Sequence, residues 1–274
     1  MRAITGTTRV YGILADPIYH VKTPEVMNAL FARAGVEGVL VPFHVAPDGL
    51  AAAVEGLRRM HNFGGFIATV PHKTAMLDLC DEVSPDARGV GAVNCVRRDP
   101  DGRMIGTMLD GLGFVAALRA SGEDPAGKRV CLAGAGGAAS AIAFALAGAG
   151  IAHLTVVNRT PARTDGLLAR LAAAHPGLSL ATDPGGGAHD ILVNGTSLGM
   201  RADDPLPLDP ALLASRPFVA EAIMEPEITP LLAAAEAAGC RVQRGRPMLD
   251  CQIALMAQHM GALQPQALNE GAAR

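Results

Sequence analysis

The sequence lacks the features that mark several large classes of protein. No uninterrupted apolar run approaches the roughly 18 residues typical of a membrane-spanning helix, and the N-terminus has no basic segment followed by an apolar one. The net charge is −3, and the lysines and arginines are scattered rather than gathered into a basic surface. We therefore expect a soluble, cytoplasmic protein that is not exported, whose partner is a small molecule and neither nucleic acid nor a membrane.

The five cysteines also lack the pattern of a disulfide framework or of a metal site. Their number is odd, no two form a C-x-x-C pair, and most lie in apolar runs. Thiols in such positions are typical of reduced core residues in a cytoplasm, and we predict no metal site. With 274 residues, half of them hydrophobic, the chain is long enough for one large domain or two ordinary ones.

The stretch from Arg129 to Thr160 predicts a strand, a tight turn, a helix and a second strand. Its turn matches the G-x-G-x-x-A fingerprint of dinucleotide-binding proteins at Gly134, Gly136 and Ala139. The N-terminus of the predicted helix would offer its N–H groups to a pyrophosphate. Ordinary tight packing of a helix rich in Gly and Ala is the alternative. The residues assigned to the cofactor here are Gly134, Ala135, Gly136, Gly137 and Ala138.

The residues that follow the second strand favour NADP over NAD. An NAD site places an acidic residue there for the ribose 2′-hydroxyl, whereas this chain has Asn158, Arg159 and Thr160. Arg163 follows one helical turn later. Two guanidinium groups and a hydroxyl suit the 2′-phosphate of NADP. A solvated basic turn is the alternative.

Strand and helix patterns alternate through the first third of the chain, which predicts a parallel or mixed sheet flanked by helices. Thr23 and Pro24 are expected at the N-cap and first position of the first helix. The apolar residues of that helix, at helical spacing, are Met27, Leu30, Phe31 and Ala34. The expected strands are residues 10–14, 39–45 and 63–70, with a hairpin formed by 92–96 and 104–108.

Lys73 and Asp110 are the candidate catalytic side chains. We expect Pro71 to open a helix with Lys73 in its first turn, where a cation opposes the helix dipole by roughly 0.3 to 1 kcal/mol. Such a placement points to a function, and it would favour a neutral amine that acts as a general base. The alternatives are an exposed lysine and, for Asp110, the N-cap of a helix that ends at Gly122.

The last part of the chain predicts two more strands and two helices. The strands are residues 190–194 and 218–223, and a helix at 231–238 is closed by Gly239. After a hinge at Gly245, a final helix is striped by Leu249, Ile253, Met256 and Met260. Gln252 lies on a neighbouring stripe of that helix, and an amide on the helix surface is its alternative interpretation.

These residues resemble the shikimate dehydrogenase family, which interconverts 3-dehydroshikimate and shikimate with NADP. The similarity runs nearly end to end and keeps the order of the family's motifs. The matching segments are Asp16-Pro17-Ile18-Tyr19-His20, Thr23-Pro24 with Asn28, Thr69-Val70-Pro71-His72-Lys73, Gly91-Ala92-Val93-Asn94, Asp110-Gly111, Gly134 to Ala139, Asn158-Arg159-Thr160, Asn194 to Met200, Thr229-Pro230-Leu231-Leu232, and Pro247-Met248-Leu249 with Gln252.

The resemblance implies an α/β protein of two domains. Residues 1–109 and 245–274 would form an α/β substrate-binding, catalytic domain with a mixed sheet. Residues 110–244 would form an inserted, Rossmann-like domain that binds NADP. The family also implies an oxidoreductase of aromatic amino acid biosynthesis, and we expect a monomer or a homodimer.

The resemblance assigns roles to individual residues as well. Lys73 and Asp110 match the catalytic pair of the family, and Asn94 and Gln252 match side chains that hold substrate hydroxyls. Thr196 and Met200 lie in a turn that resembles the family's loop beside the nicotinamide. The candidate substrate-binding residues are Val21, Thr23, Thr69, Asn94, Met224 and Gln252.

Five positions that are polar in the family pattern are apolar here. They are Val21, where a hydroxyl residue helps hold the substrate carboxylate, Ile67 in place of an asparagine, Met108-Leu109 in place of Asn-Thr, and Met224 in place of a tyrosine. A hydrogen bond to a charged group contributes about 1.5 to 3 kcal/mol, so the loss of two would severely weaken a carboxylate-bearing ligand. We therefore predict a substrate less polar than shikimate, such as a less polar cyclic analogue, while shikimate or quinate is the default substrate that the family implies.

Two functions remain at this point. In the first, NADP accepts hydride from a ring carbinol while the hydroxyl proton passes to Lys73, which Asp110 orients. In the second, the protein is a non-catalytic NADP(H)-binding sensor with an altered pocket. The presence of both Lys73 and Asp110 favours the enzyme.

Overall fold

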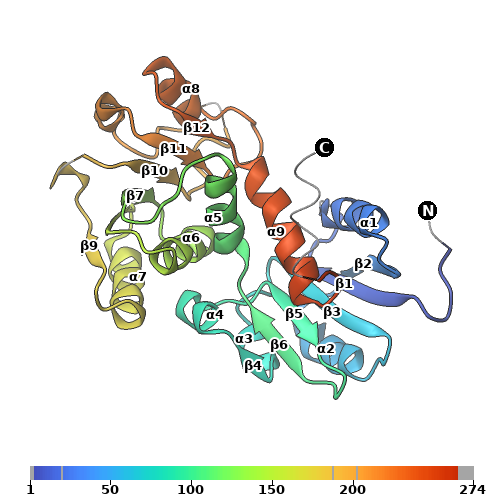
Figure 1. Ribbon diagram of the computed structural model, residues 1–274. Helices are drawn as coiled ribbons and strands as arrows, with labels where there is room; N and C mark the ends of the chain where they lie inside the picture. Colours follow the sequence, from blue (N-terminus) through green and yellow to red (C-terminus); the bar gives the residue numbers. More distant parts are fainter. Residues whose placement is uncertain (1–2, 20, 187, 202, 265–274) are drawn as a thin grey trace. The chain divides into compact units, whose positions relative to one another are not determined.

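The chain builds two six-stranded sheets, one in each of two units (Figure 1). The computed structural model describes residues 3–19, 21–186, 188–201 and 203–264, so His20 of the first family motif lies outside the described residues. The first unit joins the residues up to Leu109 with those from Gln252 onward, and the second runs from Asp110 to Cys251. The second boundary lies seven residues beyond the expected return at 245, within a helix.

The first unit contains a mixed sheet, as predicted. Its strand order is β2-β1-β3-β5-β6-β4; β1 pairs in parallel with β2 and β3, whereas β5 is antiparallel to β3 and β6. Its elements are β1 (Arg9–Ala15), α1 (Thr23–Ala34), β2 (Gly38–His44), α2 (Leu50–Arg58), β3 (Phe63–Ala68), α3 (Met76–Leu79), β4 (Glu82–Val83), α4 (Pro85–Val90), β5 (Cys95–Arg98), β6 (Met104–Thr107) and part of α9 (Arg246–His259).

The second unit is a fully parallel, Rossmann-like sheet, which confirms the predicted fold class. Its strand order is β12-β11-β10-β7-β8-β9. The chain therefore adds β8 and β9 on one side of β7, and then β10, β11 and β12 on the other side. Its elements are α5 (Asp110–Ala120), β7 (Arg129–Ala133), α6 (Gly137–Gly148), β8 (His153–Val157), α7 (Pro161–Ala174), β9 (Ser179–Ala181), β10 (Ile191–Asn194), β11 (Phe218–Glu221), α8 (Pro230–Ala237) and β12 (Val242–Gln243).

The point where the strand order reverses lies between β7 and β10. In open α/β sheets this switch point leaves a crevice at the carboxyl ends of the strands, and ligands bind there. The fingerprint turn follows β7, and the segment that begins at Asn194 follows β10. The topology therefore places two of the predicted cofactor segments at the same edge of one sheet.

The predicted N-cap of the first helix is wrong. Lys22 already has helical backbone angles and is the N-cap of α1, with no side-chain cap hydrogen bond, so Thr23 lies inside the helix. The start lies one residue earlier because Pro24 is equally well accommodated at the second position of a helix, where no N–H partner is required. The Thr23 hydroxyl is therefore not used as a cap.

The described ranges contain neither a candidate membrane span nor a disulfide. No helix in these ranges is both long and apolar enough to cross a bilayer. All five cysteines are free. The Cys95 and Cys131 thiols are buried, and burial raises their pKa values, that of Cys131 to about 12.

Helices α5 and α6 approach each other closely at Gly111. A Cβ at this position would lie 1.9 Å from the carbonyl oxygen of Ala141 and 2.8 Å from the Cβ of Ala145. Because these atoms belong to the body of α6, the helices would have to separate to admit a side chain. Gly111 therefore fixes how α6 sits against the first turn of α5, which begins with Asp110.

We predict that Gly111→Ala lowers the free energy of unfolding by about 1 to 3 kcal/mol, because a Cβ overpacks the contact between the helices. Gly148→Ala is the matched control: Gly148 ends α6, and a Cβ there would meet nothing within 4 Å. The control should equal the wild type or gain up to about 1 kcal/mol. Urea titrations followed by circular dichroism measure both, and equal midpoints for the two variants would contradict the account.

Candidate active site

The turn after β7 has the geometry of a phosphate-binding loop. Gly134 has a φ of +109°, which favours glycine, and its N–H donates to the Val157 carbonyl at 2.8 Å. A Cβ on Gly134 would lie 3.1 Å from the backbone of Gly195. The first fingerprint glycine is therefore required both by its backbone conformation and by the close approach of the segment that follows β10.

The next two glycines leave open space at the N-terminus of α6. Gly136 is the N-cap, Gly137 begins the helix, and a Cβ on either would meet nothing within 4 Å. Gly136, Gly137 and Ala138 are exposed. A helix N-terminus presents N–H groups without helical partners and carries a partial positive charge. The residues present thus fit the pyrophosphate of a dinucleotide.

The third fingerprint position serves packing. Ala139 is buried, and a Cβ on Gly195 would lie 2.9 Å from the Ala139 Cβ. The small residues at both positions allow α6 to lie directly against the chain that leaves β10. The fingerprint and the segment from Asn194 onward are consequently parts of one contact.

The end of β8 supplies the basic groups. Asn158 donates from Nδ2 to the Thr160 carbonyl at 3.0 Å, and Thr160 is the N-cap of α7 with no side-chain cap bond. Arg159, Thr160 and Arg163 are exposed. Over the described ranges of the chain, neither guanidinium has an ion pair or a side-chain hydrogen bond. Two uncompensated cations beside an N-cap suit an added phosphate.

The segment Asn194–Met200 is closed on itself by side chains. The Asn194 carbonyl Oδ1 accepts from the Thr196 N–H at 3.0 Å and from its hydroxyl at 2.7 Å. The Thr196 hydroxyl in turn accepts from the Leu198 N–H at 3.0 Å. Thr196, predicted to bind the cofactor, therefore has its hydroxyl engaged within the loop, whereas Met200 is 58% exposed.

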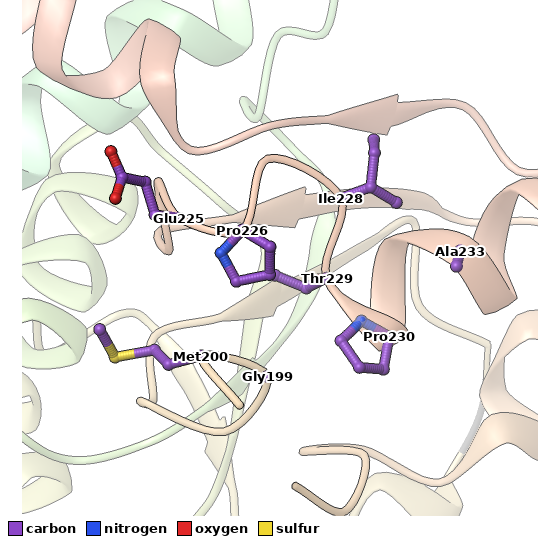
Figure 2. Close-up of a pocket in the computed structure, with 8 residues that line it drawn as sticks. All are labelled: Gly199, Met200, Glu225, Pro226, Ile228, Thr229, Pro230 and Ala233. Carbon is purple, nitrogen blue, oxygen red and sulfur yellow. The ribbon is translucent and has the colours of Figure 1, made fainter. Parts of the chain in front are cut away.

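A pocket of about 740 Å³ opens beside this loop (Figure 2). Gly199 and Met200 form one side, the segment from Glu225 to Thr229 lies opposite, and Pro230 and Ala233 of α8 complete the lining. The sequence motifs point to the Thr229-Pro230 corner but give no sign of Glu225, Pro226, Ile228 or Ala233. Their contribution depends on how the chain between β11 and α8 folds back.

In the first unit, Lys73 lies in a turn and not in a helix, so the predicted helix start at Pro71 is wrong. Helix α3 begins only at Met76. The Lys73 carbonyl accepts from the Val93 N–H at 2.8 Å, so it is engaged by a distant segment and cannot continue a helical ladder. The helix-dipole argument for Lys73 therefore does not apply, and Lys73 is half-buried rather than fully exposed.

Backbone contacts bring several candidate residues of this unit together. Thr69 directly follows β3, and its carbonyl accepts from the His72 N–H at 2.8 Å, which tightens the turn that carries Lys73. The buried His72 ring bonds the Val45 carbonyl at 2.9 Å and anchors the same turn. The Val93 N–H holds the Lys73 carbonyl, so Asn94, the next residue, lies close by.

Asn94 joins β3, β6 and the residue Leu109 in the first unit. Its carbonyl accepts from Ala68 of β3 at 2.9 Å, and its N–H donates to Thr107 of β6 at 3.0 Å. Its side-chain Oδ1 accepts from the Leu109 N–H at 2.8 Å. Leu109 directly precedes Asp110, which is buried and is the first residue of α5. The side chain of Asn94 thus fixes Leu109, the last residue of the first unit before the chain enters the second.

The remaining substrate candidates are placed as follows. Gln252 is buried on α9, so its interpretation as a surface amide is wrong. Val21 and Thr23 follow β1 in the sequence and are half-buried. The segment that carries them begins at Asp16, whose N–H donates to the Val70 carbonyl at 3.2 Å. Met224 belongs to the second unit and is 47% exposed.

The other apolar replacements are inside the first unit. Ile67 of β3, Met108 and Leu109 are all buried. Side chains in such positions present no polar atom to a ligand. Among the described residues, no group of three or more His, Cys, Asp or Glu side chains is arranged to hold a metal ion.

Comparisons with known proteins agree with this geometry. Residues 13–96 match the family model of the shikimate dehydrogenase substrate binding domain, and residues 116–182 match that of shikimate/quinate 5-dehydrogenase. The shikimate dehydrogenase (NADP(+)) of Rubrobacter xylanophilus is 43% identical over 253 residues, which cover 90% of this chain and 88% of that protein.

Two solved structures are similar over nearly the whole chain. The ligand-free 5-ketofructose reductase of Gluconobacter sp. has a TM-score of 0.82 and 34% identity, covering 93% of this chain and 98% of that one. The shikimate 5-dehydrogenase of Listeria monocytogenes, solved in complex with shikimate and NAD, has a TM-score of 0.88 and 31% identity, covering 96% and 95%.

We predict that Arg159→Asp weakens NADP binding about ten- to a hundred-fold, because it replaces a cation that suits the 2′-phosphate with a carboxylate that repels it. NAD, which lacks that phosphate, should bind no worse than to the wild type. Arg170→Asp, on the same helix but two turns beyond Arg163, is the control for a change of net charge. Fluorescence titrations with NADP and with NAD measure these affinities. Equal losses of NADP affinity in Arg159→Asp and Arg170→Asp would contradict the assignment of Arg159 to the cofactor site.

Proposed function

Because the chain belongs to the shikimate dehydrogenase family, we propose that it transfers hydride between NADP(H) and a ring hydroxyl or ketone of a substrate without the shikimate carboxylate. The family makes the protein an NADP-dependent oxidoreductase that acts on a CH–OH group. The proposal concerns the substrate and the residues that serve it.

The observation that carries the proposal is the uneven distribution of polar groups among the candidate substrate residues. The groups that match the hydroxyl-handling side of the family site are present, namely Thr69, Lys73, Asn94, Asp110 and Gln252. On the other side, Val21 replaces a hydroxyl, Ile67 an amide and Met224 a phenol. Burying a carboxylate against such groups without partners is strongly unfavourable. A substrate that keeps its hydroxyls and lacks the carboxylate avoids this penalty.

The similarity to 5-ketofructose reductase supports the same choice. That protein shares the fold of this chain, and the sugar in its name carries ketone and hydroxyl groups but no carboxylate. The fold therefore accommodates reduction of a neutral hydroxyketone. Shikimate itself stays the family's default substrate, against which the proposal is tested.

In the proposed mechanism, Lys73 handles the proton. When the substrate is oxidised, the amine of Lys73 accepts the hydroxyl proton, and in the reverse direction it returns that proton to the forming alkoxide. Asp110 orients the ammonium group and balances its charge. Asn94 and Gln252 hold neighbouring hydroxyls, which places the reacting carbon. NADP, when bound, supplies the hydride chemistry, and the N-terminus of α6 and Arg159 would hold its phosphates.

We predict that Lys73→Ala lowers kcat about a hundred-fold or more, since it removes the group that moves the proton. NADPH affinity should stay within about two-fold, because the candidate cofactor residues lie in the other unit. Lys128→Ala removes a partly exposed lysine that pairs with Glu123 and serves as the control. Steady-state and single-turnover kinetics provide the measurement. A wild-type kcat in Lys73→Ala would exclude Lys73 from proton transfer.

We also predict the substrate profile. NADPH oxidation should be fast with carboxylate-free cyclic hydroxyketones, and the KM for shikimate should exceed the micromolar range, because the loss of two charged hydrogen bonds is worth about 3 to 6 kcal/mol. Val21→Ser, which returns one hydroxyl, should lower that KM about ten-fold and leave the neutral substrates unaffected. A micromolar KM for shikimate in the wild type would overturn the shifted substrate.

The same set of substrates, shikimate and the carboxylate-free cyclic hydroxyketones, tests the sensor hypothesis. NADPH binding is followed by fluorescence while its oxidation is followed by absorbance with each substrate. Binding without turnover across the panel would favour a non-catalytic NADP(H) sensor. The presence of Lys73 and the burial of Asp110 favour the enzyme, because a sensor has no use for a proton acceptor and its charged partner.

A further inference from the structure

A fully buried carboxylate lies at the end of β11. Glu221 has 0% exposure, and four donors converge on it. Its Oε1 accepts from the N–H groups of Ala222 and Ile223 at 3.0 and 3.1 Å. Its Oε2 accepts from the Asn194 Nδ2 at 3.1 Å and from the Thr229 hydroxyl at 2.9 Å.

No cation accompanies this carboxylate in the part of the chain that the structure describes. Burial holds the pKa of the Glu221 carboxyl above its usual range, and the four donors act in the opposite direction. A buried acid that is held only by neutral donors contributes little to stability compared with an apolar side chain of the same size. Its presence in an otherwise apolar strand therefore calls for another explanation.

The donors come from two segments that are far apart in the sequence. Asn194 closes the Asn194–Met200 loop, because its Nδ2 also donates to the Leu198 carbonyl at 2.9 Å. Thr229 is the N-cap of α8, and its hydroxyl accepts from the Leu232 N–H at 3.3 Å while it donates to Glu221. Asn194 and Thr229 are as buried as Glu221 itself.

These two segments are the opposite sides of the pocket in Figure 2. The loop supplies Gly199 and Met200, and the segment that ends at Thr229 supplies Glu225, Pro226 and Ile228. The two N–H groups that Oε1 binds belong to the first residues of that segment, which also carries Met224. One carboxylate thus holds both sides of the pocket at a fixed separation.

We propose that Glu221 is a positioning residue, whose carboxylate sets the Asn194–Met200 loop against the segment 222–229 and so places the nicotinamide end of NADP. The inference rests on the proposed function, because the loop is assigned to the nicotinamide by its family resemblance. Glu221 contacts neither the substrate nor the cofactor in this account. It acts through the Asn194 side chain and through the Thr229 hydroxyl.

The chemistry of the contact predicts how substitutions behave. Glu221→Gln replaces one oxygen by an NH₂ group, which then faces two donors whichever way the amide turns. The two sides of the pocket should therefore move apart. Glu221→Asp keeps the charge but is one methylene shorter, so its oxygens cannot reach both sets of donors, and an intermediate effect is expected. Thr229→Val removes one donor to Glu221, together with the side-chain cap of α8, with little change of volume.

Two nucleotides separate positioning from a general loss of structure. NADPH contains the nicotinamide, whereas adenosine 2′,5′-bisphosphate lacks it and carries only the adenosine, its 5′-phosphate and the 2′-phosphate that would lie near Arg159. In Glu221→Gln, the Kd for NADPH should rise about ten-fold or more and kcat should fall with the preferred substrate. The Kd for adenosine 2′,5′-bisphosphate should stay within about two-fold. Glu123→Gln, which alters a carboxylate that pairs with Arg241 and Lys128, is the control.

Each outcome of this experiment bears on the inference. If Glu221→Gln lost affinity equally for NADPH and for adenosine 2′,5′-bisphosphate, or bound NADPH as the wild type does, the assignment of Glu221 as a positioning residue would be overturned. If Glu221→Gln does not fold, Thr229→Val decides, since it should weaken NADPH binding in the same direction and spare the bisphosphate. The proposed function is judged separately on the wild type. If the wild type neither binds nor oxidises NADPH, that function fails; if it does both and Glu221→Gln matches it, only the inference fails.

Discussion

The hydrogen bonds of one buried asparagine hold the first unit together at its candidate site. Asn94 bonds through its backbone to β3 and β6 and through its side chain to Leu109, and its neighbour Val93 holds the carbonyl of Lys73. If these bonds were lost, the Lys73 turn, the hairpin and Leu109 would no longer have fixed positions relative to one another. The resemblance gives Asn94 a second task, which is to hold a substrate hydroxyl. In the proposed function, structural and ligand-binding demands would therefore meet in one side chain.

The second unit depends on a comparable close contact at its switch point. Gly134 and Gly195 lack side chains where the ends of β7 and β10 meet, and Ala139 fills the little space that remains. Glu221 extends this arrangement to β11 and α8. The nucleotide-binding edge of the sheet is thus built from backbone approaches and buried polar bonds. The arginines after β8 are exposed and lie outside this frame, and in the proposed function they would select NADP over NAD.

The sequence predicts best those features whose cause is local. The fingerprint glycines and the hairpin expected at 92–96 and 104–108 each follow from the conformation or the pattern of a few neighbouring residues, and both are present in the structure, the hairpin as β5 and β6. The Lys73 turn could not be predicted in this way. Its carbonyl is taken by Val93, 20 positions away in the sequence, and no local pattern reports such a bond.

Other errors have similar origins. Helical period alone places Gln252 on the flank of α9, and only the tertiary packing buries it. Thr23 precedes a proline and so resembles an N-cap, but the helix accepts that proline one position later. Glu221 had a visible signal, a charged residue inside the apolar run Phe218–Ile223, and the nature of its partners required the fold. Asn28 of the family motif proves structural, because its side chain bonds both backbone groups of Leu40.

The central claim is that this protein keeps the hydroxyl chemistry of its family and has lost the groups that recognise a carboxylate. The most direct measurement compares shikimate with its methyl ester, two substrates that share every ring hydroxyl and differ in the charge of one group. The account predicts that kcat/KM for the ester equals or exceeds that for shikimate. A preference for shikimate of a hundred-fold or more would contradict it, because such a preference requires partners for the carboxylate.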